Sequence, residues 1–402
     1  MRPFKNSIVM LAMFFCVSIS SRVNAGILWE KELVLDANTN SAPLASCLNK
    51  DGNSIIVMTV ECPKGSFPIK GDSILWEIGA DGNATRISPK NIDGSKVWTN
   101  ADPVGFGCAI ASDNLGNFLT VGVLHKQEDE KGQKIALIPK NDKAEKIISP
   151  HNSIEHHSLK KMISLQDNTF ALVGDRNGHG LYSRIDNQGR IIQEKLFDMG
   201  QNEICTDVDL IKSDNLTLAV VGISFKISIK DPNENSAENF ILTCDPNQKT
   251  VHEDHFTGGL PGILFPKVCC LDNGNIIVFY KIKSEYPKTP LWARCYTKEL
   301  KLLWEKEIFA ADKMPFFFDV VSRRTGGFVA WIGQMESLEF YFLDNDGTKI
   351  DYAQYKGTPG GAFGVAGFNL FRVNGRTIAV FKEGTAGNIK ECTIKAKVIA
   401  LD

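Results

Sequence analysis

The sequence has no strong excess of either charge and only one long apolar run. Its 45 lysines and arginines face 47 aspartates and glutamates, which gives a formal net charge of −2 at pH 7. Nucleic-acid-binding proteins cluster lysine and arginine to contact phosphates, so this balance argues against a nucleic-acid partner. After the apolar run near the N-terminus, no segment is apolar enough to predict a membrane-spanning helix.

Several motifs of common enzyme classes are also missing. The sequence has no nucleophile elbow, no phosphate-binding P-loop and no glycine fingerprint for dinucleotides. The Ser-x-Asp-x-Gly-x-Thr-Trp box of sialidase-type propellers is absent too. No stretch shows the 3.6-residue apolar period of an amphipathic helix, which excludes a helical fold class.

The N-terminus has the three-part pattern of a secretory signal. Residues 1–5 carry two positive charges, an apolar run extends from Ile8 to Ile19, and Val23-Asn24-Ala25 ends the segment with a small residue. We therefore expect a signal peptide over residues 1–25 and a secreted or periplasmic protein. The apolar run falls short of the roughly 20 residues that span a bilayer. A retained membrane anchor remains the alternative.

The mature chain that this cleavage would leave has an odd number of cysteines. In an oxidising compartment an odd count leaves at least one thiol unpaired or bonded to another chain. Many of them sit in apolar runs, where a cysteine packs as a small hydrophobic side chain. We expect mostly buried thiols and one or two disulfides among the nine positions: 47, 62, 108, 205, 244, 269, 270, 295 and 392.

A repeated unit determines the predicted fold. Each unit reads as a short apolar strand, an Asp/Asn/Gly turn, a second apolar strand, a polar loop, and a third and fourth strand around another turn. Asparagine and glycine tolerate the positive φ of tight hairpins, so such turns between apolar runs are strong hairpin signals. Four strands in about 50 residues is the pattern of a propeller blade. The first turn of each unit lies near residues 52, 116, 167, 214, 274, 326 and 375.

The two ends of the chain predict how the ring closes. Residues 27–35 closely match residues 303–309, which read as the outermost strand of the fifth unit. The seventh unit has three clear strands before the C-terminus. We therefore predict a single all-β propeller over residues 26–402, with about seven four-stranded blades and the N-terminal strand in the last blade. Six or eight blades, a β-sandwich or a multi-domain β protein are the alternatives.

The repeats resemble a known group of propellers. Asp272-Asn273-Gly274-Asn275 before an apolar strand, followed by Leu302-Leu303-Trp304-Glu305-Lys306, resembles the quinoprotein-like repeats of exported bacterial proteins. Trp29–Leu35 and Leu75–Glu77 also match these repeats closely. This group includes noncatalytic scaffolds and pyrroloquinoline-quinone dehydrogenases, so the resemblance implies an architecture but no single activity.

Two motifs suggest a cofactor, and a structural interpretation is favoured for both. The resemblance implies that a quinone site would carry a vicinal disulfide such as Cys269-Cys270, but adjacent strand residues point to opposite faces and favour two packed thiols. Asp344-Asn345-Asp346-Gly347 resembles the start of a calcium loop, but position 12 of that loop is Tyr355, not a carboxylate. We expect no cofactor and no metal, with pyrroloquinoline quinone and calcium as alternatives.

The best candidate for a contact loop joins the second and third strands of the third unit. It contains Asp175, Arg176, Asn177 and His179, which offer charge and hydrogen bonds on a turn at the expected propeller rim. The histidines at 151, 156 and 157, and those at 252 and 255 beside Glu253 and Asp254, match no recognised metal spacing. We interpret these histidines as solvated surface residues.

Two functions from different classes fit these observations. The first is an exported noncatalytic scaffold that binds a protein or glycan partner through its rim or central channel. The second is an enzyme with its site at the channel mouth, either a quinoprotein-like oxidoreductase or a hydrolase or lyase. Catalytic groups drawn from several blades would be scattered in the sequence, so the missing motifs count only weakly against the enzyme.

Overall fold

The described part of the chain consists of strands and turns. The computed structural model describes residues 26–34, 38–64, 72–87, 97–98, 109–125, 133–138, 146–148, 157–197, 202–211, 217–226, 236–245, 249–257, 265–282, 290–310, 315, 317–334, 337–357, 365–385 and 393–402. The predicted signal peptide, Cys108, Cys392, His151 and His156 lie outside these residues. Within them, no helix is long and apolar enough to cross a membrane.

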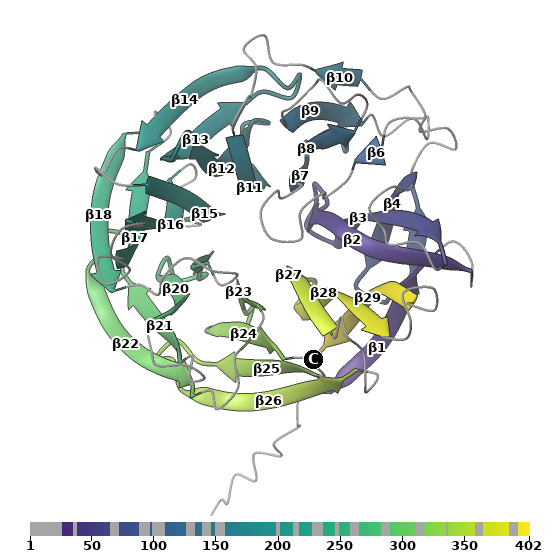
Figure 1. The fold of residues 1–402 in the computed structure, drawn as a ribbon. Coiled ribbons are helices and arrows are strands. Elements are labelled where there is room, and N and C mark those ends of the chain that lie inside the picture. The colour runs from purple at the N-terminus through teal and green to yellow at the C-terminus, as the bar shows by residue number, and fades with distance from the viewer. Residues whose placement is uncertain are drawn as a thin grey trace, which may run out of the picture.

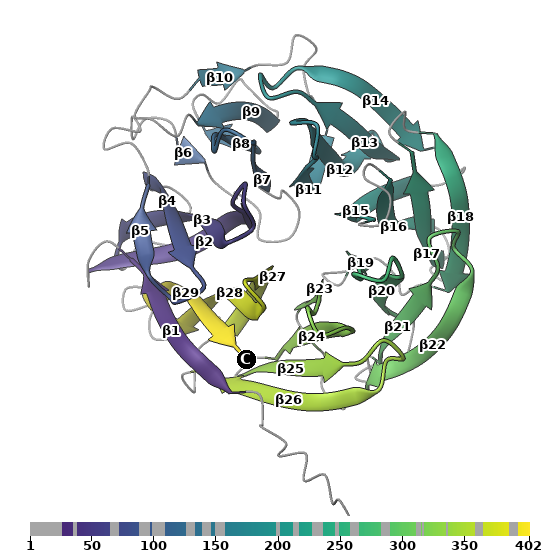
Figure 2. The ribbon, with the colours of Figure 1, turned by 180° about the vertical axis from the view of Figure 1, so that it is seen from behind.

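The strands form sheets arranged around a central opening, as Figures 1 and 2 show from opposite sides. The innermost strands are β2 (Thr39–Leu48), β7 (Ala109–Ser112), β11 (His157–Ser164), β15 (Asn202–Leu210), β19 (Lys267–Cys270), β23 (Phe317–Ser322) and β27 (Val365–Val373). Each innermost strand contacts the next around the ring, and β27 contacts β2. The second strands are β3 (Ser54–Pro63), β8 (Phe118–His125), β12 (Phe170–Arg176), β16 (Leu218–Lys226), β20 (Ile276–Lys281), β24 (Phe328–Gly333) and β28 (Arg376–Thr385).

The outer half of each sheet follows the same antiparallel order. The third strands are β4 (Asp72–Gly79), β9 (Gln133–Ile138), β13 (His179–Ile185), β17 (Ser236–Cys244), β21 (Leu291–Tyr296), β25 (Ser337–Leu343) and β29 (Thr393–Leu401). The outermost strands are β5 (Ala84–Arg86), β10 (Lys146–Ile148), β14 (Ile191–Phe197), β18 (Thr250–Thr257), β22 (Leu302–Phe309), β26 (Lys349–Lys356) and β1 (Ile27–Leu33). The fold is therefore an all-β propeller.

The prediction of four strands in each of seven blades is wrong for one sheet. Six sheets have four strands, whereas the sheet of β7 to β10 also contains β6 (Val97–Trp98) and has five in the described residues. The short β7 pairs only with Phe118–Val121 of β8, which leaves the end of that edge open. β6 pairs with Leu124 and His125 on the same edge. A two-residue strand in a polar segment has no sequence signal of its own.

Neighbouring sheets pack against each other through both faces. Ile55 and Val57 of β3 belong to the core shared with β27, β28 and β29, whereas Ile56 and Met58 belong to the core shared with β7 and β8. Successive residues of a strand point to opposite faces, so a blade between two neighbours needs a continuous apolar run. This explains why the second strands contain apolar runs such as Ile55–Met58, Leu218–Val221 and Ile276–Tyr280.

The first strand of the described chain belongs to the last sheet. β1 pairs antiparallel with β29, with Trp29 opposite Ala400 and Leu33 opposite Ala396. The Trp29 Nε1 donates a hydrogen bond to the Ala80 carbonyl at 3.0 Å, in the hairpin turn of the neighbouring sheet. Trp304 of β22 makes the equivalent bond to the Asn345 carbonyl at 2.9 Å. The similarity between residues 27–35 and 303–309 thus reflects one shared contact between sheets.

Gly82 lies directly beneath the Trp29 ring, and its replacement tests this contact. Its φ is +85°, and a Cβ there would lie 2.8 Å from the ring. Gly52 has φ of +65° with nothing within 4 Å of a Cβ, so it is the matched control. Positive φ costs an alanine about 1–2 kcal/mol, and overpacking adds about 1–3 kcal/mol. Gly82→Ala should therefore lower the free energy of unfolding in urea by clearly more than Gly52→Ala. Equal losses would contradict a packed Trp29.

Candidate functional site

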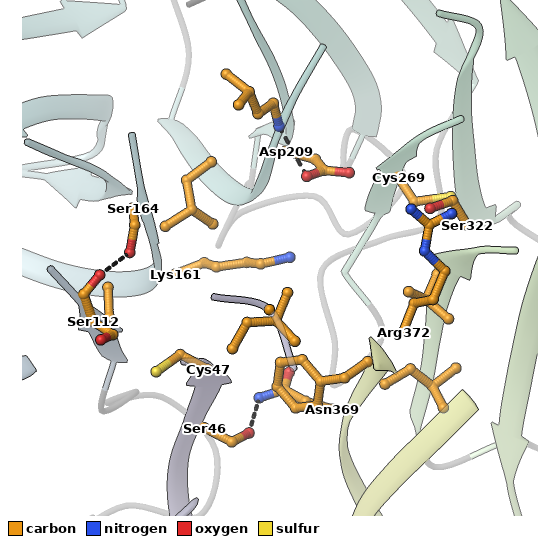
Figure 3. Close-up of a pocket in the computed structure, with 18 of the residues that line it drawn as sticks. Ser46, Cys47, Ser112, Lys161, Ser164, Asp209, Cys269, Ser322, Asn369 and Arg372 are labelled. Carbon is orange, nitrogen blue, oxygen red and sulfur yellow. Dashed lines mark hydrogen bonds between the residues drawn. The ribbon is translucent and has the colours of Figure 1, made fainter. Parts of the chain in front are cut away.

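A cavity of about 1020 Å³ occupies the central channel and is lined by the innermost strands of all seven sheets. Its lining is mixed in character. It includes serine hydroxyls, asparagine amides and charged side chains, together with the half-buried apolar residues Ile163, Val321 and Phe371. The Asn369 Nδ2 donates to the Ser46 Oγ at 2.8 Å, and the Ser164 Oγ donates to the Ser112 carbonyl at 2.5 Å (Figure 3). Hydrogen-bonding groups thus converge from several sheets.

The charged residues occupy one repeated position. In each sheet a backbone hydrogen bond closes the turn after the innermost strand, for example from the Leu271 N–H to the Asn275 carbonyl. We call the N–H donor of this bond the closing residue. The residue four positions before it is charged or polar in five successive sheets. These residues are Lys161, Asp207, Lys267, Asp319 and Asn369, and the remaining two sheets have Ala45 and Ala109 there. Charge therefore alternates around one level of the channel.

A β-bulge precedes this position in four of the strands. Register shifts occur at Pro43/Ala45, Leu159/Lys161, Cys205/Asp207 and Gly367/Asn369. A bulge adds one residue to a strand and redirects the side chains that follow it. Three of the four shifts lead to a polar residue at this position, whereas Lys267 and Asp319 occupy it without a shift.

Lys161 and Asp207 form the most buried ion pair of the site. The Lys161 Nζ lies 2.5 Å from the Asp207 Oδ1, and the side chains are 34% and 0% exposed. Figure 3 shows Lys161 extended into the cavity. Burial alone would lower the pKa of the Lys161 ammonium, but the carboxylates of Asp207, Asp319 and Asp209 outweigh it and hold that pKa above its usual value. Lys161 is therefore a fixed positive charge on the channel wall.

The aspartates also link neighbouring innermost strands. The Asp207 Oδ2 accepts the Val268 N–H at 2.9 Å, and the Asp209 Oδ2 accepts the Cys270 N–H at 2.7 Å. The Asp319 Oδ2 accepts the Leu370 N–H at 2.8 Å in the same way. Innermost strands of different sheets share no ladder, so these carboxylates satisfy backbone donors that would otherwise be buried without partners.

Asp319 has the most unusual environment of these carboxylates. It is 6% exposed and lines the cavity, and its other oxygen has no hydrogen-bond partner among the described residues. Burial raises the pKa of this carboxyl, since it outweighs the opposing attraction of Lys267 and Lys161 and the Leu370 hydrogen bond. A buried acceptor facing a cavity is a candidate contact for a ligand.

The mouth of the cavity carries a second set of charges. Arg372 of β27 binds Asp272 of the β19–β20 turn through two hydrogen bonds, of 2.8 Å and 3.1 Å. Arg324 in the β23–β24 turn also lines the mouth and is exposed. No histidine occurs among the described residues that line the cavity. The described lining therefore offers carboxylates, lysines, arginines, amides and hydroxyls, but no imidazole base.

The sequence-predicted contact loop lies outside the cavity lining. Asp175 and Arg176 end β12, His179 begins β13, and Asn177 forms with Gly178 a two-residue turn with positive φ at both positions. Arg176 forms an ion pair with Glu194, and the His179 Nδ1 lies 3.7 Å from the Glu203 Oε2. The Glu203 N–H donates to the Gly178 carbonyl at 2.8 Å. The contacts of Glu203 with His179 and Gly178 tie the turn to the next sheet, and the role of the turn in binding stays a prediction.

The cofactor motifs adopt structural arrangements. Cys269 and Cys270 are both buried and belong to different inter-sheet cores, one on each side of their sheet. The Asp344 Oδ1 accepts the N–H groups of Asp346 and Thr348, as in a hairpin turn. No cluster of three or more histidine, cysteine or acidic residues suited to a metal occurs in the described residues.

His255 lies on an outer strand, and the cysteines named below are buried. The His255 Nε2 lies 2.5 Å from the Glu253 Oε1 on the outer strand β18, far along the sheet from the innermost strand. Cys47, Cys205, Cys244 and Cys295 carry no disulfide. Burial raises the pKa of the Cys244 thiol to about 11 and that of Cys295 to about 12. A protonated, buried thiol is a poor nucleophile.

Sequence reasoning missed Lys161, Asp207, Lys267 and Asp319. A signal for them existed, because each lies at the same offset from a turn that the repeat identified. Superimposing the units on their turns would have shown an alternating series of lysine and aspartate. No local motif marks these charged residues, because they come together only after the sheets have assembled.

Comparison with known proteins supports the fold and no particular activity. No family model matches the chain, and no curated protein sequence does. The fold is similar to that of prolyl oligopeptidase B from Galerina marginata, with a TM-score of 0.50 and 11% identity over 89% of this chain and 51% of that chain. The chain thus spans about half of that enzyme.

Two other solved structures also match. The β-propeller domain of the Trilobed protease from Pyrococcus furiosus has a TM-score of 0.48 and 10% identity, over 85% of this chain and 91% of that one. The GH93 α-L-arabinofuranosidase of Fusarium graminearum has a TM-score of 0.46 and 13% identity, over 78% and 95%. At these identities the likeness concerns the fold alone. The chain is a β-propeller protein, and its membership of the quinoprotein-like group is not shown.

Proposed function

We propose that the protein is an exported, noncatalytic binding protein that holds a glycan or protein ligand in its central channel. The observation that carries this proposal is the cavity of about 1020 Å³, to which all seven innermost strands contribute. Ligand sites are concave, largely preformed, and combine apolar surface with a few placed polar groups. The proposal treats the seven sheets as blades of one ring, with β1 as the strand that joins its ends.

The lining favours binding over catalysis. A general base near neutral pH is most often a histidine, and none lines the described cavity. One observation favours the alternative, an enzyme of the hydrolase or lyase class, because the raised pKa of Asp319 would suit a general acid. Export to the periplasm or outside the cell rests on residues 1–25. The proposal includes the turn from Asp175 to His179 as a second contact on the rim.

A substitution that fills the channel tests the proposal. Asn369 is half-buried and lines the cavity, so Asn369→Trp should project a bulky ring into it. Binding to a glycan array or a peptide library should fall at least tenfold while the urea midpoint changes little. Gln188→Trp, at an exposed turn between β13 and β14, is the matched control and should bind normally.

The same ligand decides between scaffold and enzyme. After a day with the protein, the bound glycan or peptide should have an unchanged mass, because a scaffold returns its ligand intact. Cleavage or oxidation by the wild-type protein that Asp319→Asn abolishes would establish the enzyme instead. Unchanged binding by Asn369→Trp would place the ligand outside the channel.

A further inference from the structure

Two lysine–aspartate pairs occupy equivalent places in the ring. Lys161 on β11 precedes Asp207 on the neighbouring strand β15, and Lys267 on β19 precedes Asp319 on the neighbouring strand β23. All four residues lie four positions before the residue that closes their turn. Both aspartates use Oδ2 to accept an N–H from the next innermost strand, that of Val268 or Leu370. The two aspartates are therefore held by the next strand in the same way, although a β-bulge precedes both residues of the first pair and neither residue of the second.

The first pair forms an ion pair, which we call closed, and the second does not, which we call open. The Lys161 Nζ reaches Asp207 at 2.5 Å. The Lys267 Nζ has no carboxylate oxygen within 4.0 Å among the described residues, although Lys267 is the strongest opposite charge acting on Asp319. Lys267 and Asp319 both line the cavity. A repeated arrangement thus forms an ion pair at one site and leaves a gap at the other.

The gap selects the chemistry of its occupant. Lys267 can only donate hydrogen bonds, and an ionised Asp319 can only accept them. A hydroxyl group accepts from the ammonium and donates to the carboxylate, so it satisfies both ends at once. An anion would be attracted by Lys267 but repelled by Asp319 and Asp209, and a cation would be repelled by Lys267. A neutral hydroxyl therefore fits better than either ion.

The surrounding lining favours several hydroxyls on one ligand. The Asn369 amide and the Ser46 hydroxyl lie on the next two innermost strands, and the half-buried Phe371 offers an aromatic surface nearby on β27. A sugar ring presents adjacent hydroxyls together with an apolar C–H face. A serine or threonine of a peptide presents one hydroxyl only, so it would contact fewer of these groups than a sugar ring can.

We propose that the open Lys267–Asp319 pair is the anchor of a site for a neutral saccharide, one of whose hydroxyls bridges the ammonium and the carboxylate. This proposal rests on the proposed function, because it names the ligand class of the same cavity. Lys161–Asp207 is then the structural counterpart, closed on itself and linked to the neighbouring strand. The Asp319 oxygen without a partner receives its missing donor when the saccharide binds.

The test uses the full protein on an array of neutral and acidic glycans, followed by calorimetry with the strongest neutral binder. Lys267→Met and Asp319→Asn should each weaken binding about 10- to 100-fold, the range for losing a hydrogen bond to a charged group. The double variant should be little weaker than either single variant, because one hydroxyl bridges both groups. Lys31→Met, at an exposed lysine of β1, is the matched control and should bind like the wild type.

Each other outcome overturns the inference in a distinct way. If a neutral glycan binds and both variants keep its affinity, the anchor is wrong while a binding function stands. If only acidic glycans or only peptides bind, the ligand class is wrong. If nothing on the array or in the peptide library binds, the proposed function fails as well. Should Lys267→Met fold poorly, Lys267→Gln retains a donor and should restore part of the affinity.

Discussion

Replacing Asp207 by alanine should lower the free energy of unfolding by about 3 kcal/mol, the low end of the range for breaking a buried ion pair. Asp207 is fully buried, and its loss removes a partner from three groups, the Lys161 ammonium and the N–H groups of Val268 and Val208. The low end applies because Lys161 is 34% exposed and can turn partly towards water in the cavity. Urea unfolding of the purified protein measures the loss.

Two further variants separate this pair from ordinary surface charge. Glu194→Ala breaks the half-exposed pair with Arg176 and should cost about 0–1 kcal/mol. The double variant Lys161→Met with Asp207→Leu should recover part of the loss, because an apolar pair of similar volume is often tolerated where an ion pair was buried. A small loss for Asp207→Ala would mean that the carboxylate does not connect the β11, β15 and β19 strands.

Asp319→Asn should stabilise the free protein at neutral pH and at the same time weaken its ligand binding. Burial raises the pKa of Asp319, so the ionised carboxylate is disfavoured in the folded chain relative to the unfolded chain. The folded protein then binds more protons, and its stability falls as the pH rises from the usual carboxyl pKa through the raised one. An asparagine keeps an oxygen for the Leu370 N–H and removes this penalty.

The pH dependence identifies the cause. The advantage of Asp319→Asn should be largest above the raised pKa and should fade in acid, where Asp319 of the wild type is protonated. The charged groups acting on Asp319 are Lys267, Lys161 and Asp207, so unfolding should also be compared in Lys267→Met. A stabilising substitution that costs affinity is the signature of a strained binding group. Loss of stability at neutral pH would refute this interpretation.

The fold was predictable wherever its causes are local or repeated. The Asp/Asn/Gly turns could be predicted because their side chains bind their own backbone, as the Asp113 Oδ1 does when it accepts the N–H groups of Leu115 and Asn117. The apolar strands could be predicted because a blade between two neighbours buries both of its faces. β6 was not predictable, since its pairing depends on a free stretch of the β8 edge and not on its own residues.

The site was less predictable than the fold. Lys161 and Asp207 lie in different sheets, and neither sits in a motif that predicts an ion pair. The sequence predicts a contact loop at Asp175–His179 because exposed polar turns often carry function, whereas the residues of the channel wall lie in strands whose sequence resembles a core. A comparison of the units at equal distance from their turns would have identified the charged level, although not the difference between the closed and the open pair.

A structure of the protein with a bound neutral saccharide tests the central claim most directly. We predict that the sugar lies in the central channel, with one hydroxyl within hydrogen-bonding distance of both the Lys267 Nζ and an Asp319 oxygen, and that the Lys161–Asp207 pair is unchanged. A sugar bound on the outer strands or at the rim turn of Asn177, with the channel filled by water alone, would contradict the account.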